Sequence, residues 1–251
     1  MECLKYYLPK PLIDAEGGYL MKSFKLVLLT FVLTVFCFTL SGSPRTNAQQ
    51  KEDKNVCFRW AFGAIQRGEH KPEFFAITRD TTLKTGDKLK MLVELEKKCF
   101  VYLIYHSAQG EVSMLFPYDM QQFARDYAPG KRYYIPEGDR WFELDENVGR
   151  ETFYLLVSAQ RLIELERLFG KCTTADPDRK PELAKQILTE IRKIKRRYRK
   201  LATFAERPVP IGGSVRAITE GEKAFHPDIA TIAVEISAND FFSRAFTIDH
   251  Q

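Results

Sequence analysis

The run Cys99–His106, with the sequence CFVYLIYH, decides the fold class of this 251-residue chain. A strand that is buried on both faces has a nearly continuous apolar sequence, whereas a half-exposed strand alternates apolar and polar residues. Cys99–His106 is apolar on both faces, as a central strand of a β-sandwich is. The preceding segment, Lys88–Glu96 (KLKMLVELE), alternates, with four apolar residues from Leu89 to Leu95 on one face.

Short strand patterns recur along the rest of the chain, and Gly, Pro, Asn and Asp turn residues separate them. The further expected strands are Val56–Ile65, Glu73–Thr78, Val112–Phe116, Tyr133–Ile135, Trp141–Leu144, Thr152–Ser158, Ser214–Thr219, Ile229–Ile236 and Arg244–Ile248. Short strands at such spacing are typical of sandwiches and barrels. We therefore predict a mainly β fold, an antiparallel β-sandwich of Ig-like or jelly-roll-like type, in a single domain over residues 56–251.

The segment QGEVSMLFPYD, residues 109–119, combines a turn, a strand and a stop. Gly110 suits the turn, and Pro117 ends the ladder because proline has no N–H to donate. Simple alternation places Val112, Met114 and Phe116 on one face of the strand. Tyr118 and Asp119, which follow the proline, are the candidates for function in this segment, at the edge of the sheet.

A helical hairpin is predicted at residues 160–205, where the apolar period changes from two to about 3.6. Its first helix is expected over Gln160–Phe169 with Gly170 as the stop, and its second from about Pro181 to Ala205. The second helix has one apolar stripe, which consists of Leu183, Ile187, Ile191, Ile194, Tyr198 and Leu201. The hairpin is therefore expected as an insertion between strands of the β domain.

The positive charge of the chain concentrates in this hairpin. Residues 161–207 hold 14 basic and 7 acidic residues, although the net charge of the whole chain is only +5. Seven cations fall within RKIKRRYRK, and they are Arg192, Lys193, Lys195, Arg196, Arg197, Arg199 and Lys200. Their number exceeds what the helix dipole stabilises, and their mutual repulsion costs stability unless anions offset it.

Two interpretations of this basic segment stay open. It is either a solvated helix face paired with acids on the adjacent sheet, or a docking surface. An envelope protein, an anionic envelope polymer or membrane headgroups would suit such a surface. Nucleic acid suits it less, because the chain is expected to be exported and no nucleic-acid-binding motif stands near the patch.

The N-terminal residues 1–48 have the pattern of an extension followed by a secretory signal. Basic residues around Lys22 precede the apolar run Leu26–Leu40, and small residues lead to a possible cleavage site after Ala48. Met21 is then the simplest start. Residues 49–55 form a polar linker, and the expected location is the periplasm or cell envelope. An uncleaved anchor is the alternative, because Leu26–Pro44 approaches the length of a membrane span.

No motif for catalysis, a metal or another cofactor stands out, so we expect none of the three. Three cysteines remain beyond the leader, Cys57, Cys99 and Cys172, and an oxidising compartment permits one disulfide whose pairing the pattern leaves open. The favoured interpretation is that they are small, buried apolar residues without a disulfide. The alternative to a non-catalytic protein is an envelope hydrolase with a site at the sheet edge. Its candidate residues are Tyr118, Asp119, His106 and Asp139.

Short motifs between residues 80 and 160 carry a resemblance to a family. In order they are Leu83-x-x-Gly86-Asp87, a Tyr102-Leu103-x-Tyr105 strand, Gly110-x-Val112 leading to Leu115-Phe116-Pro117, the Ile135-Pro136 step and Gly149-x-Glu151. This order resembles the bacterial family catalogued as domain of unknown function 4384. The resemblance implies an exported or surface-associated β domain, often fused to unrelated modules, without established activity. Together these features predict an exported, non-catalytic binding or scaffolding protein that docks through its basic helix.

Overall fold

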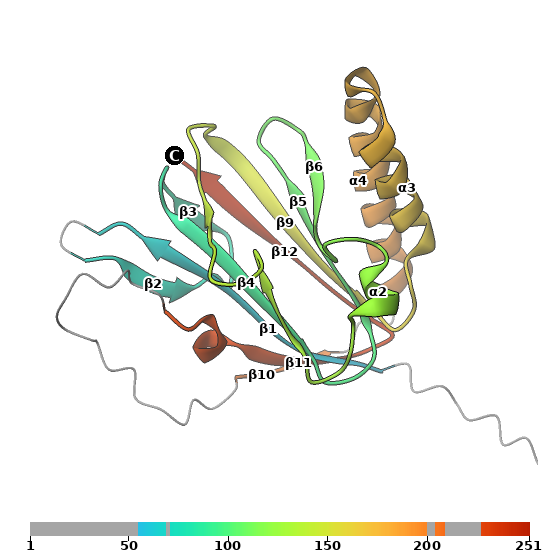
Figure 1. Ribbon diagram of the computed structural model, residues 1–251, viewed down its shortest axis with the longest axis horizontal. Coiled ribbons are helices and arrows are strands. Elements are labelled where there is room, and N and C mark those ends of the chain that lie inside the picture. Colours follow the sequence, from blue (N-terminus) through green and yellow to red (C-terminus); the bar gives the residue numbers. More distant parts are fainter. Residues whose placement is uncertain (1–54, 69–70, 200–203, 209–226) are drawn as a thin grey trace, which may run out of the picture. The chain divides into compact units, whose positions relative to one another are not determined.

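Two packed β-sheets form the core of the protein in the computed structural model, which describes residues 55–68, 71–199, 204–208 and 227–251 (Figure 1). The first sheet, sheet A, has the strand order β10-β11-β1-β4-β7, with β2 beside β1 and β8 beside β4. Its strands are β1 (Asn55–Gln66), β2 (Glu73–Ala76), β4 (Lys88–Leu95), β7 (Arg132–Ile135), β8 (Phe142–Glu143), β10 (Phe204–Pro208) and β11 (Val234–Asn239).

The second sheet, sheet B, has the order β3-β12-β9-β5-β6. Its strands are β3 (Thr81–Leu83), β5 (Phe100–His106), β6 (Val112–Phe116), β9 (Gly149–Ser158) and β12 (Phe241–His250). All pairs are antiparallel except β3 with β12, which is parallel. The mainly β, sandwich-like fold predicted from the sequence is confirmed.

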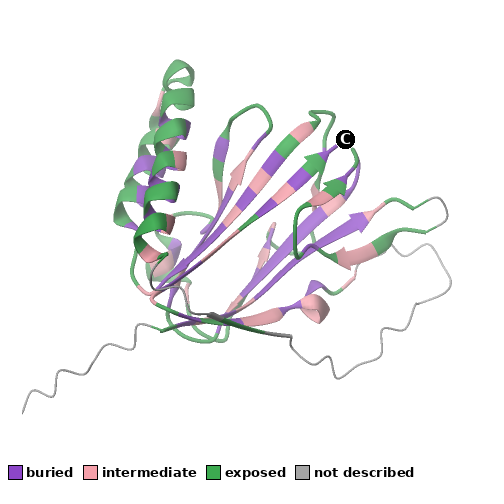
Figure 2. Cartoon of the chain, turned by 180° about the vertical axis from the view of Figure 1, so that it is seen from behind, coloured by how far each residue is buried: buried purple, intermediate pink, exposed green. Residues whose placement is uncertain are grey.

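The core between the sheets follows from strict alternation along the strands. In β1, the inward positions Val56, Phe58, Trp60, Phe62 and Ala64 are all almost fully buried. Aromatic rings from both sheets meet there, with ring centroids of Phe62 5.1 Å from Phe153 and 5.4 Å from Phe246. Figure 2 shows this burial as purple bands that recur along the strands.

The predicted hairpin lies between β9 and β10 and covers the outer face of sheet B. It comprises α3 (Ile163–Thr174), the short helix η1 (Pro177–Arg179) and α4 (Lys180–Tyr198). The two faces of strand β5 pack in two different cores, one between the sheets and one under the hairpin. Val101 and Leu103 point into the sandwich, whereas Tyr102 and Ile104 pack against the helices.

One buried hydroxyl fastens the hairpin to the sheet. Tyr102 is fully buried, and its hydroxyl donates to Glu166 Oε1 at 2.6 Å while it accepts the Leu162 N–H at 2.9 Å. Arg161 pairs with the same Glu166 carboxylate. The first turn of α3 is thereby attached to the middle of sheet B by groups that burial makes costly to leave unpaired.

Charges alternate across the outer face of sheet A. The register places Glu235 opposite Arg59, Arg59 opposite Glu94, and Glu94 opposite Arg132. Glu94 Oε2 lies 3.1 Å from Arg59 Nη1 and 2.9 Å from Arg132 Nε. A shift of one residue in any of these pairings would break the row, so the row helps to fix the register.

A bulge corrects the expected facing of β6. Leu103 pairs with Phe116 and Ile104 with Met114, so Leu115 is an extra residue opposite the step between Leu103 and Ile104. Val112 and Met114 therefore pack toward the helices, whereas Phe116 enters the core between the sheets. Simple alternation was wrong for Phe116, because a bulge reverses the facing of every residue beyond it.

Several element boundaries also differ from the sequence expectation. Helix α3 continues through Gly170 to Thr174, and Ile229–Ile232 is the short helix η2, which precedes β11, rather than part of a strand. The strands β3 and β10 and the short helix α2 (Gln122–Arg125) were not expected. The predicted leader, residues 49–54 of the linker and the strand at 214–219 lie outside the described residues, whereas Asn55 begins β1.

Substitution of Tyr102 by Phe should lower the free energy of unfolding by about 1–3 kcal/mol, because it leaves the Leu162 N–H without a partner and removes one hydrogen bond from the Glu166 carboxylate. Urea denaturation measures the change. Tyr198→Phe is the matched control, since the Tyr198 ring stacks on Phe241 at 4.5 Å and keeps that contact. An equal loss in both variants would contradict the role of the Tyr102 hydroxyl.

Candidate functional site

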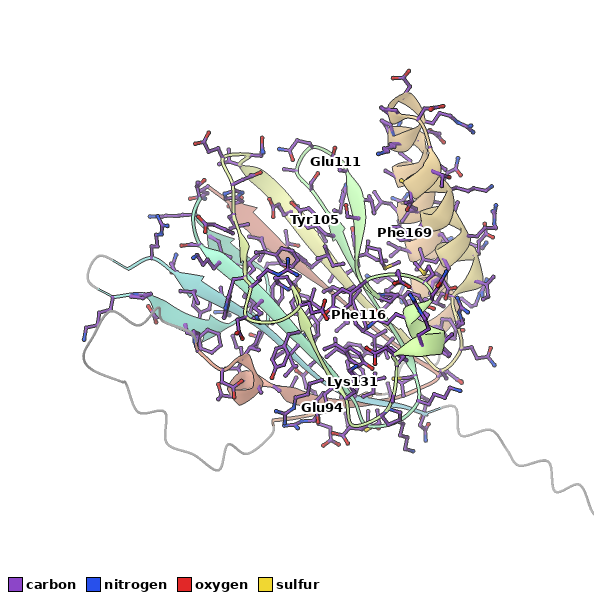
Figure 3. The ribbon with its side chains drawn as sticks, viewed as in Figure 1. Glu94, Tyr105, Glu111, Phe116, Lys131 and Phe169 are labelled. Atoms are coloured by element: carbon purple, nitrogen blue, oxygen red, sulfur yellow. The ribbon has the colours of Figure 1, made fainter. Side chains whose placement is uncertain are left out.

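A groove runs beside the edge strand β7 and is formed by the segments that follow two prolines. Pro117 ends β6 and Pro136 ends β7, and both follow cis peptide bonds. The segment after Pro117 connects sheet B to sheet A, and the segment after Pro136 leads to β8. Figure 3 shows Lys131 and Glu94 at one end of this region and Tyr105 and Glu111 toward the other end of the sandwich.

This β7 groove consists of two adjoining hollows that share Tyr134 and Gly138. The first has a volume of about 340 Å³ and the second about 370 Å³. The first is lined by Tyr118, Asp119, Gln122, Arg125, Asp126, Lys131, Arg132, Tyr133, Tyr134, Glu137 and Gly138. The second is lined by Lys90, Tyr134, Gly138, Asp139, Trp141, Pro227, Asp228 and Ile229.

Tyr118 stands at the rim of the first hollow, where the sequence predicted a sheet-edge candidate. The bulge in β6 turns Phe116 into the core, and the Tyr118 ring packs edge-on against it at 5.5 Å. The Tyr118 hydroxyl donates to the carbonyl of Tyr134 in β7. Desolvation raises the pKa of this hydroxyl to about 12, yet 42% of the residue is exposed. Tyr118 therefore offers a fixed ring and keeps its proton near neutral pH.

Asp119, the second sheet-edge candidate, is committed to local structure. Its carboxylate accepts the N–H groups of Gln121 and Gln122 at 2.8 and 3.0 Å and pairs with Arg125 at 2.9 Å. Slight desolvation raises the pKa of Asp119, but these hydrogen bonds outweigh it and the net pKa is lowered. A general acid needs a raised carboxyl pKa near neutral pH, so Asp119 has the opposite character.

Lys90 lines the second hollow. This residue was not identified as part of a site from the sequence. It is 5% exposed, and its ammonium donates to the carbonyls of Gly138 and Arg140 at 2.5 and 2.7 Å. The same nitrogen lies 5.6 Å from the ring centres of both Tyr134 and Trp141. Desolvation lowers the pKa of Lys90, and the charge of Asp139 opposes that effect. Lys90 thus positions the loop and rings of the groove.

The structure separates the four residues of the predicted hydrolase site. Tyr118 and Asp119 line the first hollow and Asp139 the second. His106 pairs with Val112 at the start of β6, whereas Tyr118 follows its end, roughly 15 Å away at the usual strand rise. Desolvation lowers the pKa of His106. These positions do not assemble the four side chains into one catalytic group.

Thr85, His250 and Glu151 form a second cluster with the outline of a catalytic triad. His250 Nε2 lies 3.2 Å from Thr85 Oγ1, and Nδ1 lies 3.5 Å from Glu151 Oε1. The Thr85 hydroxyl, however, donates to the carbonyl of Asp145 at 2.9 Å, so Nε2 must donate to Oγ1. A general base needs the reverse direction. The hydrogen bonds of this cluster therefore hold local structure and do not prepare the Thr85 hydroxyl for nucleophilic attack.

One proton between His250 Nδ1 and Glu151 would satisfy both buried groups. His250 is 2% and Glu151 5% exposed, and Nδ1 makes no hydrogen bond in the described part of the chain. Desolvation raises the pKa of Glu151, against the hydrogen bond from Tyr105 and the neighbouring His250. The raised pKa retains a proton on this pair to higher pH than an exposed glutamate would.

The predicted docking residues form an exposed surface on α4. Arg192, Lys193, Arg196, Arg197 and Arg199 are exposed and Lys195 is half-buried, whereas Lys200 lies outside the described residues. The apolar stripe of the helix, including Ile187, Ile191 and Ile194, faces sheet B. We call the six described cations the basic face.

Compensating anions are few around the basic face. Lys193 pairs with Glu190 at 3.3 Å, and Arg192 donates to the Thr189 hydroxyl at 3.0 Å. Within residues 55–68, 71–199, 204–208 and 227–251, the remaining four cations form no ion pair. By contrast, α3 pairs Arg167 with Glu164. Positive charge therefore accumulates without compensation at the C-terminal half of α4.

Cys57, Cys99 and Cys172 form no disulfide in the described part of the chain, and desolvation raises the pKa of Cys99 to about 12. Among the described residues, no group of three His, Cys, Asp or Glu side chains could hold a metal ion. No helix in the same part of the chain is long and apolar enough to cross a bilayer.

Residues 82–161 match the family model described as Domain of unknown function (DUF4384), which confirms the resemblance seen in the sequence motifs. This range contains the lining of the first hollow and excludes the basic face. No curated protein and no solved structure matches the chain.

Substitution of Lys90 by Met should accelerate amide hydrogen exchange in the loop 136–141 by about tenfold or more, because hydrogen bonds to a charged group contribute about 1.5–3 kcal/mol. Exchange measured by mass spectrometry locates the effect. Lys88→Met is the control, since Lys88 is half-exposed and lies 3.6 Å from Glu143 at the surface. Unchanged exchange in the Lys90 variant would show that the loop does not depend on this ammonium.

Glu151→Gln should remove a pH-dependent part of the stability. Because the folded-state pKa of Glu151 is raised, its contribution is fully present below the ordinary value of 4.5 and is lost as pH rises through the folded-state pKa. The difference in unfolding free energy between wild type and variant should therefore shift in favour of the variant with rising pH. Urea titrations from about pH 4 to 8 test this, with the exposed Glu146→Gln as control. A constant difference would contradict it.

Proposed function

We propose that this chain, whose residues 82–161 form a DUF4384 domain, is an exported, non-catalytic binding or scaffolding protein of the cell envelope that docks through the basic face of α4. The observation that carries the proposal is the group of cations on α4, most of which form no ion pair with the described residues, on a helix whose apolar stripe is already used against sheet B. Such a surface is free to meet an anionic partner without loss of packing.

The physical cost of the basic face supports a docking role. Like charges three and four residues apart on a helix repel one another, and the helix dipole offsets only about 0.3–1 kcal/mol for a cation near the C-terminus. Arg196, Arg197 and Arg199 nevertheless stand together at that end. An anionic surface with closely spaced charges, such as an envelope polymer, a membrane headgroup layer or an acidic protein face, would offset this repulsion.

The envelope location rests on the leader pattern of the sequence, which lies outside the described residues. The non-catalytic part of the proposal rests on engaged side chains. Asp119 accepts the N–H groups of Gln121 and Gln122 where α2 begins, and the hydroxyl of Thr85 donates away from His250. Both candidate arrangements for hydrolysis are thus occupied by hydrogen bonds that hold local structure.

Reversal of three charges, Arg196, Arg197 and Arg199 to Glu, should abolish salt-sensitive retention of the full-length chain on washed envelope fractions. Retention is measured by immunoblotting of the pellet at about 0.05 M and about 0.5 M NaCl, since surface charge interactions are screened at the higher ionic strength. Wild-type retention should fall at high salt, and the variant should already be released at low salt.

The matched control reverses Arg179, Lys180 and Lys185 to Glu. These residues are exposed at the start of α4, so the control changes the net charge equally on the same hairpin. This control variant should be retained on the envelope fractions as the wild-type chain is. Equal release of both variants would contradict a localised docking face. Salt-resistant retention of all three proteins would instead support an uncleaved N-terminal anchor.

A further inference from the structure

The β7 groove presents aromatic rings in a form that suits a flat ligand ring. Tyr118 is one of the few exposed large apolar side chains in the described residues, at 42% exposure. Tyr134 lies where the two hollows meet, and Trp141 lines the second hollow, where its ring rests edge-on against Phe74 at 6.2 Å. Rings held in this way lose little conformational entropy when a ligand stacks on them.

The charges of the groove are nearly balanced, because its two hollows are lined by four cations and five carboxylates, and this distinguishes the groove from the basic face. Cations and carboxylates in the first hollow occur in equal number, and several are paired: Asp119 with Arg125, Asp126 with Lys131, and Arg132 with Glu94. A site for a polyanion needs a net excess of cations. The groove therefore favours a ligand that is polar but uncharged.

We propose that the β7 groove is a binding site for a neutral saccharide chain. A sugar ring has a face of C–H groups and a rim of hydroxyls. The C–H face suits an exposed aromatic ring such as that of Tyr118. The exposed carboxylates of Glu137 and Asp139 in the loop 136–141 are acceptors for hydroxyls, and hydrogen bonds to charged acceptors are the stronger ones.

The edge of β7 fits a peptide strand less well. Strand addition requires free N–H and C=O groups along the edge. The Tyr134 carbonyl already accepts the Tyr118 hydroxyl, so an added strand would have to displace that contact. A saccharide stacked on the Tyr118 ring leaves the hydroxyl in place.

This site is separate from the proposed docking function. The basic face lies on the hairpin that covers sheet B, whereas the groove lies beside β7 of sheet A. All lining residues of the first hollow fall within the DUF4384 match, and the basic face falls outside it. Loss of one activity by substitution should leave the other intact.

Tryptophan fluorescence provides the test. The chain has two tryptophans, of which Trp60 is 3% exposed in the core and Trp141 lines the groove. Titration of the purified chain with chitotetraose, cellotetraose and maltotetraose, each tested singly, should give a saturable change with at least one of them. Trp141→Phe should remove the signal, and Tyr118→Ala should weaken binding about tenfold when followed by calorimetry.

Two further variants keep the test decisive. Glu137→Ala changes an exposed loop side chain and should weaken binding several-fold without effect on the thermal midpoint. Val148→Ala truncates an exposed apolar residue away from the groove and should bind as wild type does. The proposal is overturned if none of the three tetrasaccharides gives saturable binding, or if the groove variants bind as tightly as wild type. Binding of an unstructured peptide alone, abolished by Tyr118→Ala, would also overturn it.

Discussion

The hydroxyl of Tyr102 is the constraint on which the arrangement of layers depends. Strand β5 has a core on each face, so a polar group at Tyr102 is removed from water whichever elements cover sheet B. The group can stay there only because it donates to Glu166 and accepts from the Leu162 amide. These two partners belong to the beginning of α3. The position of the hairpin, and with it the direction of the basic face, follows from these two hydrogen bonds.

The alternating strands were predictable because burial on one side of a sheet imposes a period of two. The apolar stripe of α4 was predictable for the same reason with a helical period. The facing of Phe116 was not, because the bulge at Leu115 arises from pairing with β5, and pairing partners are not visible in a local pattern. The bulge matters for the site, since it turns Phe116 inward and brings Tyr118 to the groove.

The candidate site was predicted only in part. Tyr118 and Asp119 were found because a proline stop before polar and aromatic residues marks the end of a strand. Lys90 and Trp141 were missed, since they meet only when β4 and the segment between β7 and β8 lie together. A signal was nevertheless present. Lys90 directly precedes the apolar run Met91–Val93 in β4, and a lysine that is buried there must find partners in the fold, as burial of an unpaired ammonium is costly.

The hairpin and the DUF4384 domain are not physically independent, although the family match ends at residue 161. Tyr102 belongs to the motif that the domain contributes, but both hydrogen-bond partners of its hydroxyl follow that boundary. A DUF4384 domain without such a hairpin must cover or hydrate this position in another way. In this chain the hairpin covers that position on the outer face of sheet B, whereas the β7 groove lies beside the other sheet.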